Sequence, residues 1–224
     1  AIDLTDLTDL LAQDSKTLVS LMHVNNETGT VLDLKRVSVI CKEHNVLFHS
    51  DTVQSIGKTN FDLQELSIDF LVASAHKFHG PKGVGFAFVR KNSGLQPLFY
   101  GGEQEKGLRP GTEAVHQIAG MAKDLALSYS YLEKEFSGFK INGNSDDFYN
   151  ILNVLLPFSD DKTAMILFHL DMKGIAVSRG SACQSGSIRP SHVLAEILSV
   201  EDLKKPSLRI SFSHYNTMED VDLL

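Results

Sequence analysis

The sequence of 224 residues has a deficit of basic residues, few cysteines and no long apolar run. With 21 Lys and Arg against 28 Asp and Glu, the formal charge is −7, so a nucleic-acid partner has no electrostatic support. No apolar stretch approaches the length that spans a bilayer, so we expect no membrane partner. The two cysteines, Cys41 and Cys183, lie far apart without metal-ligand spacing. They indicate free thiols in a reducing, cytoplasmic compartment, with no metal site.

Short apolar runs alternate with amphipathic helical patterns over the first 135 residues. The patterns predict strands over 17–23, 46–51, 70–73 and 84–89, and helices over 4–12, 33–45, 63–66 and 114–135. Strands that alternate with helices at this spacing favour an α/β fold with a mainly parallel sheet. Cys41 falls on the apolar face of the helix predicted over 33–45 and is interpreted as a packed core thiol.

The pattern changes at Phe136. From there, strands are predicted over 140–142, 151–156, 175–177 and 208–212, and helices over 162–173, 192–198 and from about Met218, with Thr217 as its cap. This mixture is typical of a smaller α+β domain. We therefore predict a large domain over 1–135 and a small domain over 136–224 that carries Cys183.

Polar side chains follow the predicted strands of the large domain. Asn26, Asp51, Gln54 and Lys77 each come after an apolar run. Ligands of parallel sheets bind beyond the carboxyl ends of the strands. These four residues are therefore candidates for one ligand site.

Lys77 is the candidate nucleophile of this site. It follows Ser74 and His76 at the mouth of a buried strand, where a partly desolvated amine can attack a carbonyl. Such an amine can condense with the aldehyde of pyridoxal phosphate, and a carboxylate such as Asp51 can keep the pyridine nitrogen protonated. Each residue alone also has an ordinary explanation, such as a strand cap for Asp51 or a solvated surface group for Lys77.

Several motifs together resemble the cysteine desulfurase family, fold-type I pyridoxal-phosphate enzymes with the class-V aminotransferase fold. They are Val24-Asn-Asn-Glu-Thr-Gly29, Ser50-Asp-Thr-Val-Gln-Ser55, Ser74-Ala-His-Lys-Phe-His-Gly-Pro-Lys-Gly83, Arg109-Pro-Gly-Thr-Glu113, Ser178-Arg-Gly-Ser-Ala-Cys-Gln-Ser-Gly186 and Ser207-Leu-Arg-Ile-Ser211. Their order and spacing fit along nearly the whole chain.

The resemblance implies a set of residues that contact pyridoxal 5'-phosphate. They are Lys77 as the covalent attachment, Asp51 at the ring nitrogen, Asn26 and Gln54 at the ring, Ser74 and His76 at the phosphate, and Thr112 at the phosphate of the partner subunit's cofactor in a homodimer.

The resemblance also implies a substrate and a route for its sulfur. Arg209, with Asn26, would bind L-cysteine, and Cys183 would take its sulfur as a persulfide while L-alanine leaves. The persulfide would pass to an acceptor protein for iron–sulfur assembly or tRNA thiolation. Cys183 sits among small polar residues that allow a loop to move, and Arg179 nearby favours the thiolate.

Two alternatives remain open. A selenocysteine lyase or another class-V aminotransferase-like enzyme would use the same cofactor site, although a plain aminotransferase needs no thiol at Cys183. The other alternative is a truncated, non-catalytic chain that dimerises with a complete partner. The family's N-terminal segment, with a Gly/Thr-rich phosphate loop and a histidine that stacks on the ring, would precede Ala1. The join at Glu135-Phe136 is also shorter than in the family.

Overall fold

The computed structural model describes residues 2–13, 16–128, 140–141, 150–156, 160–179, 191–213 and 215–223. Contacts divide the chain into two compact units. The first unit holds Ala1–His23 and Leu32–Tyr131, and the second holds Val24–Val31 and Leu132–Leu224. The domain boundary expected after residue 135 falls outside the described residues and stays a prediction.

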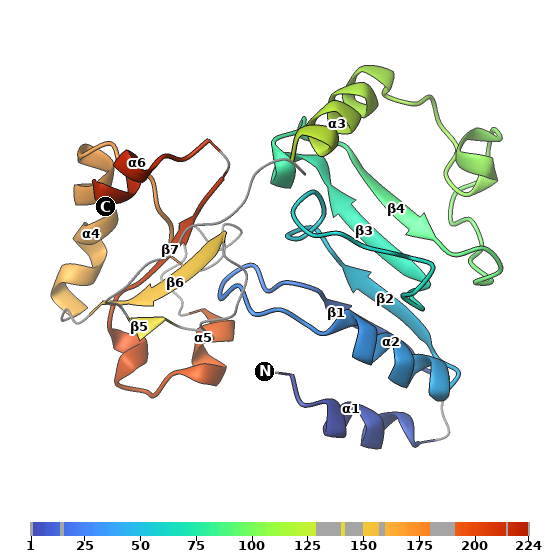
Figure 1. Cartoon of the computed structure of the whole chain (residues 1–224), viewed down its shortest axis with the longest axis horizontal. Coiled ribbons are helices and arrows are strands. Elements are labelled where there is room, and N and C mark those ends of the chain that lie inside the picture. Colours follow the sequence, from blue (N-terminus) through green and yellow to red (C-terminus); the bar gives the residue numbers. More distant parts are fainter. Residues whose placement is uncertain are drawn as a thin grey trace. The chain divides into compact units, whose positions relative to one another are not determined.

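The first unit is built on a four-stranded mixed sheet in the order β1-β2-β3-β4 (Figure 1). The strands are β1 (Leu18–Met22), β2 (Leu47–Asp51), β3 (Phe70–Ser74) and β4 (Gly85–Val89). β1 pairs with β2 and β2 with β3 in parallel, whereas β3 and β4 are antiparallel. The predicted α/β fold with a mainly parallel sheet is therefore confirmed.

Three helices accompany this sheet. They are α1 (Leu4–Leu11), α2 (Leu34–Glu43) and α3 (Val115–Ser128). The side chain of Asp3 caps α1 by accepting hydrogen bonds from the amides of Thr5 and Asp6. Asp33 caps α2 in the same way through the amide of Arg36. A side-chain oxygen at this position satisfies amides that the first helical turn leaves unpaired, which is why both helices start where the sequence predicts.

The helices α1 and α2 pack on one face of the sheet. Alternate strand residues such as Phe48 and Leu71 join residues of α1 and α2, including Val37 and Cys41, in one buried apolar cluster. Cys41 is thus the packed thiol that the sequence predicts. Strand residues of opposite parity face away from this core, and Leu18 is 56% exposed.

The short helix predicted over 63–66 is instead a turn. Arg90, which follows β4, donates from Nη2 to the carbonyls of Leu63 (2.9 Å) and Leu66 (2.7 Å). Its Nε donates to the carbonyl of Ile68 (2.7 Å). The amides of Glu65 and Leu66 both donate to the carbonyl of Asp62, so a single turn forms here rather than a continuing helix.

The second unit contains a three-stranded antiparallel sheet in the order β5-β6-β7. The strands are β5 (Lys140–Ile141), β6 (Ile151–Leu155) and β7 (Ser207–Ser211), and the helices are α4 (Asp160–Met172), α5 (His192–Ile197) and α6 (Met218–Asp222). Val154, Leu208 and Ile210 form its core with residues of α4. Thr217 caps α6 in a capping box, as the sequence predicts.

The strand predicted over 175–177 is wrong. These residues follow the end of α4, where the amide of Ile175 still donates to the carbonyl of Leu170 (2.9 Å). Gly174 has φ of 78°, a conformation that glycine adopts freely at a helix end. The first β contact comes one residue later, as an isolated bridge between Ser178 and Arg209.

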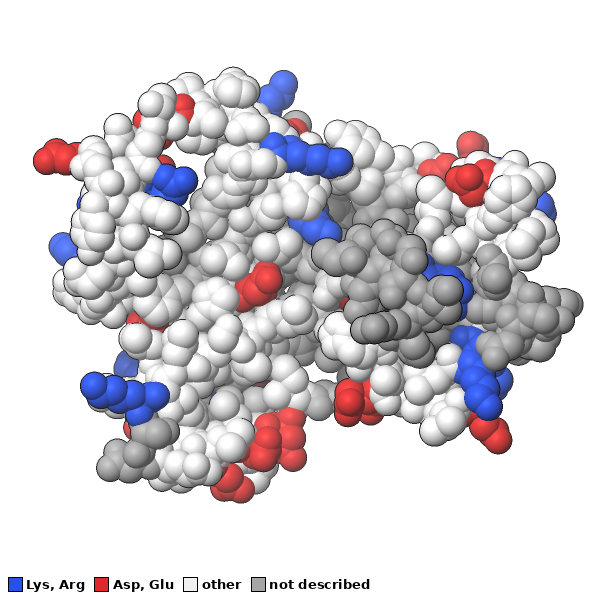
Figure 2. Space-filling model, turned by 180° about the vertical axis from the view of Figure 1, so that it is seen from behind, with Lys and Arg blue, Asp and Glu red and all other residues white. Residues whose placement is uncertain are grey.

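Charged side chains of both signs are interspersed on the face shown in Figure 2. No helix in the described part of the chain is both long and apolar enough to cross a membrane.

Replacing Arg90 with Met should lower the free energy of unfolding by about 3 kcal/mol, because three backbone carbonyls lose a charged donor. Chemical denaturation measures the change, with Lys91→Met as the control for loss of an exposed neighbouring charge. Equal effects of the two substitutions would contradict this role of Arg90.

Candidate active site

The parallel register brings the carboxyl ends of three strands to one edge of the first unit's sheet. Asp51, the last residue of β2, pairs with Met22 of β1 and with Val72 of β3. β3 ends two residues later at Ser74, and the 3₁₀ turn η1 (Ala75–Phe78) follows directly. Asp51 and the turn that carries Lys77 therefore leave neighbouring strands at the same edge.

Backbone contacts fix the carboxylate of Asp51. Its Oδ1 accepts from the amide of Val53 (2.9 Å), and its own carbonyl accepts from the amide of His23 (2.9 Å). The next residue, Thr52, is buried and donates from Oγ1 to the carbonyl of Val72 (2.8 Å). Asp51 as a whole is half-buried, so the residue is not closed off from a ligand at this edge.

The η1 turn presents three polar side chains from a buried base. Ala75 and Phe78 are buried, whereas Lys77 is half-buried and His76 is exposed. The hydroxyl of Ser74 and Nδ1 of His76 are 2.9 Å apart, within hydrogen-bond distance. This segment thus offers an alcohol and an imidazole in contact, and an amine one residue further along the chain.

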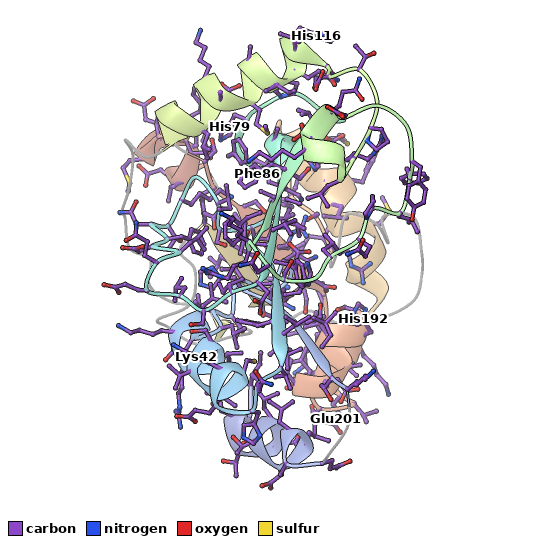
Figure 3. The ribbon with its side chains drawn as sticks, turned by 90° about the vertical axis from the view of Figure 1, so that its right-hand side faces the viewer. Lys42, His79, Phe86, His116, His192 and Glu201 are labelled. Atoms are coloured by element: carbon purple, nitrogen blue, oxygen red, sulfur yellow. The ribbon has the colours of Figure 1, made fainter. Side chains whose placement is uncertain are left out.

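The residues that follow η1 are tightly packed. His79 ends η1 with φ of 72°, in the left-handed region. A Cβ at Gly85 would lie 2.3 Å from the carbonyl oxygen of Ala73, so only glycine allows β4 to start here. Figure 3 shows His79 near α3 and Phe86 on β4. From α3, Gln117 Nε2 donates to the carbonyl of Lys82 (3.1 Å).

Lys58 is a site residue that sequence reasoning missed. Its Nζ donates to the carbonyl of Gln54 (3.2 Å), the half-buried residue expected at the cofactor ring. Burial, and then the positive charge of Lys77, lower the pKa of Lys58 to about 8. The sequence signal was slight, because a lysine after Gly57 reads as a solvated loop residue.

His23 is a second residue that the sequence did not single out. It is buried at the end of β1, with Nδ1 2.9 Å from the hydroxyl of Ser55. Its ring meets Phe61 edge-on, with centroids 5.3 Å apart. Burial lowers the pKa of His23 to about 4, so the imidazole is neutral at physiological pH.

These groups fit the chemistry of pyridoxal phosphate. The hydroxyl of Ser74 and the imidazole of His76 lie close enough together to serve one phosphate. A carboxylate at Asp51 suits a protonated ring nitrogen, and the amine of Lys77 suits an aldehyde. The positive charges of Lys58 and Lys77 favour an anion at this edge.

The remaining expected residues belong to other segments of the chain. Asn26 and Arg209 meet in the second unit, where Arg209 Nη1 donates to the carbonyl of Asn26 (3.0 Å). Thr112 is exposed in the loop between η2 (Gln104–Gly107) and α3. Cys183 lies outside the described residues. The roles assigned to all these residues stay predictions.

Comparison with known proteins places this chain in a family. The family model described as aminotransferase class-V matches residues 1–137 and 127–224. The chain is 38% identical over 240 residues to the cysteine desulfurase IscS of Dictyoglomus turgidum, covering 99% of this chain and 60% of that protein.

Two solved structures are also similar. A NifS-like protein from Rickettsia africae matches with a TM-score of 0.82 and 31% identity, covering 99% of this chain and 64% of that one. A structure of SspA in complex with cysteine matches with a TM-score of 0.76 and 32% identity, covering 96% and 64%.

The chain therefore belongs to the aminotransferase class-V family, in the group of the cysteine desulfurases. It spans about 60% of the length of the curated relative described above. The family that the motifs around Asp51, Lys77 and Arg209 indicate is confirmed.

We expect the contribution of His23 to stability to depend on pH. Below pH 6.5 His23 is protonated in the unfolded chain. In the folded chain it takes up this proton only when the pH falls to about 4. The free energy of unfolding should therefore fall by about 3 kcal/mol from this group as the pH drops through that window. Denaturation of the wild type and of His23→Gln at several pH values isolates the effect. A difference between the two that stays constant with pH would rule out the titration.

Proposed function

We propose that this chain forms part of a pyridoxal-phosphate-dependent cysteine desulfurase, which removes sulfur from L-cysteine and leaves L-alanine and a persulfide on Cys183. Members of the matched family use pyridoxal phosphate, and one structural relative is described with cysteine. The observation that carries the proposal is the placement of Asp51 and the Ser74-Ala-His-Lys77 turn at one edge of parallel strands.

The first unit supplies the residues for the cofactor. Lys77 would hold it covalently, Asp51 would keep a proton on the ring nitrogen, and Ser74 and His76 would donate to the phosphate. When bound, the cofactor supplies an electron sink for bond changes at the substrate's Cα. The amine of Lys77, when it is not bonded to the cofactor, would move the Cα proton of the substrate.

Arg209 and Cys183 would act on the substrate. The Arg209 guanidinium suits a carboxylate, which it can bind through two parallel hydrogen bonds. The thiolate of Cys183 would attack the substrate sulfur, so that an S–S bond forms as the Cβ–S bond breaks. The electron pair of the broken bond stays with the carbon fragment, which takes up protons and leaves as alanine. The persulfide would then pass to an acceptor protein.

A homodimer accounts for exposed apolar side chains around Thr112. Leu98 and Tyr100 are 84% and 86% exposed, and Phe99 and Val115 are exposed as well. Exposed apolar groups gathered in one stretch mark an interaction surface. A second copy over this stretch would let Thr112 approach the partner's cofactor, the position that the resemblance implies.

Borohydride reduction of the loaded protein should fix the cofactor on Lys77, because reduction makes the bond between the amine and the aldehyde permanent. Peptide mapping by mass spectrometry locates the modified residue. Lys77→Ala should show no modification, whereas Lys82→Ala, which changes an exposed lysine on the same loop, should leave it intact. A modified lysine at another position would refute the assignment.

The two cysteines should differ in reactivity. Burial, and then the charge of Asp69, raise the pKa of Cys41 to about 11, so little thiolate forms there at pH 8. We expect alkylation of Cys183 to be at least about tenfold faster, given its polar neighbours.

After turnover, mass spectrometry should find the extra sulfur on Cys183. Cys183→Ser should abolish sulfide release, while Cys41→Ser keeps it. Extra sulfur on Cys41 would overturn the proposed mechanism.

A further inference from the structure

Residues 24–31 form a turn that is closed by its own hydrogen bonds. The amide of Asn25 donates to the carbonyl of Thr30 (2.9 Å), and the amide of Gly29 donates back to Asn25 (3.0 Å). The side chain of Asn25 accepts from the amides of Glu27 (2.9 Å) and Thr28 (3.0 Å). The carbonyls of residues 26 and 27 accept from side chains outside the turn.

Two neighbouring strands supply those side chains. Arg209 Nη1 donates to the carbonyl of Asn26 (3.0 Å), and Asn153 Nδ2 donates to the carbonyl of Glu27 (3.1 Å). Asn153 and Arg209 lie directly opposite each other on β6 and β7. One cross-strand pair therefore holds two consecutive carbonyls of the turn.

A buried carboxylate makes a third connection. Glu27 is only 1% exposed, and its Oε2 accepts a hydrogen bond from the hydroxyl of Ser191. The same hydroxyl accepts from the amide of Leu194 (3.1 Å) and so caps α5. Asn153 is fully buried. Loss of one partner from such a buried polar contact is costly, so these contacts hold the turn in one position.

We propose that Glu27 and Asn153 are positioning residues for Arg209. They fix the carbonyl of Asn26, and this carbonyl in turn orients the guanidinium of Arg209 toward the carboxylate of an amino-acid substrate. The inference rests on the proposed role of Arg209 in substrate binding. Two parallel hydrogen bonds to a carboxylate need a guanidinium plane fixed within a narrow range, so a loose Asn26 carbonyl reduces carboxylate selectivity.

The test compares L-cysteine with its uncharged carboxamide as substrates of the full-length, cofactor-loaded protein. The measured quantity is the ratio of kcat/KM for the acid to that for the amide. Arg209→Met should lower this ratio by about 100-fold, since one charged pair is lost. Asn153→Ser should lower it by about tenfold, because Arg209 remains but is less well oriented. Glu27→Ala should resemble Asn153→Ser, and Glu27→Gln, which keeps a polar partner for Ser191, should restore most of the ratio.

Hydrogen exchange of the peptide that covers residues 24–31 gives a readout independent of activity. Exchange should be faster in Asn153→Ser and Glu27→Ala than in the wild type. Thr217→Ala, which removes the cap of α6, serves as the matched control and should change neither the ratio nor this exchange. If Glu27→Ala does not fold, Asn153→Ser still carries the comparison.

Faster exchange together with an unchanged acid-to-amide ratio would show that Glu27 and Asn153 are only structural, and would overturn the inference while leaving the proposed function intact. An unchanged ratio in Arg209→Met would overturn both the inference and the proposed role of Arg209.

Discussion

The parallel pairing of β1, β2 and β3 is the constraint on which the first unit depends. Pairing of Met22 with Asp51, and of Asp51 with Val72, sets which side chains leave the sheet at one edge. Because side chains alternate between faces, a slip of one residue in β2 would move Phe48 out of the core and Asp51 onto the face that the helices cover. The apolar residues of the core thus set the register of β2. That register determines where the carboxylate of Asp51 lies, although Asp51 itself is not part of the core.

Local patterns predicted most elements of this fold, and the failures have non-local causes. Apolar alternation and the cap at Thr217 can be recognised from neighbouring residues, and the structure confirms that cap. The turn at 63–66 depends on Arg90, which lies more than twenty positions away in the sequence. The apolar run at 175–177 has the composition of a strand. Its first amide, that of Ile175, instead donates to the carbonyl of Leu170 near the end of α4.

The candidate site likewise has residues that could be predicted from local sequence and residues that could not. Asp51 and Lys77 were predictable because polar groups after buried strands gather at one sheet edge, and the structure confirms that placement. Glu27 and Asn153 were not, because their significance lies in contacts with residues more than a hundred positions apart. A glutamate in a polar loop looks solvated in sequence, and only the structure shows that Glu27 is buried and bonded to Ser191.

Electrostatics at the edge of the first unit's sheet argues for an anionic ligand there. Two lysines close enough for one to lower the pKa of the other repel each other in the folded chain, and burial adds to the cost of charging Lys58. His23, neutral and buried beside Ser55, adds no further positive charge to this edge. An anion bound near Ser74 and His76 would offset it and raise the pKa of Lys58 toward its ordinary value. The charge at this edge thus favours the binding of a phosphate, the group that Ser74 and His76 are proposed to hold.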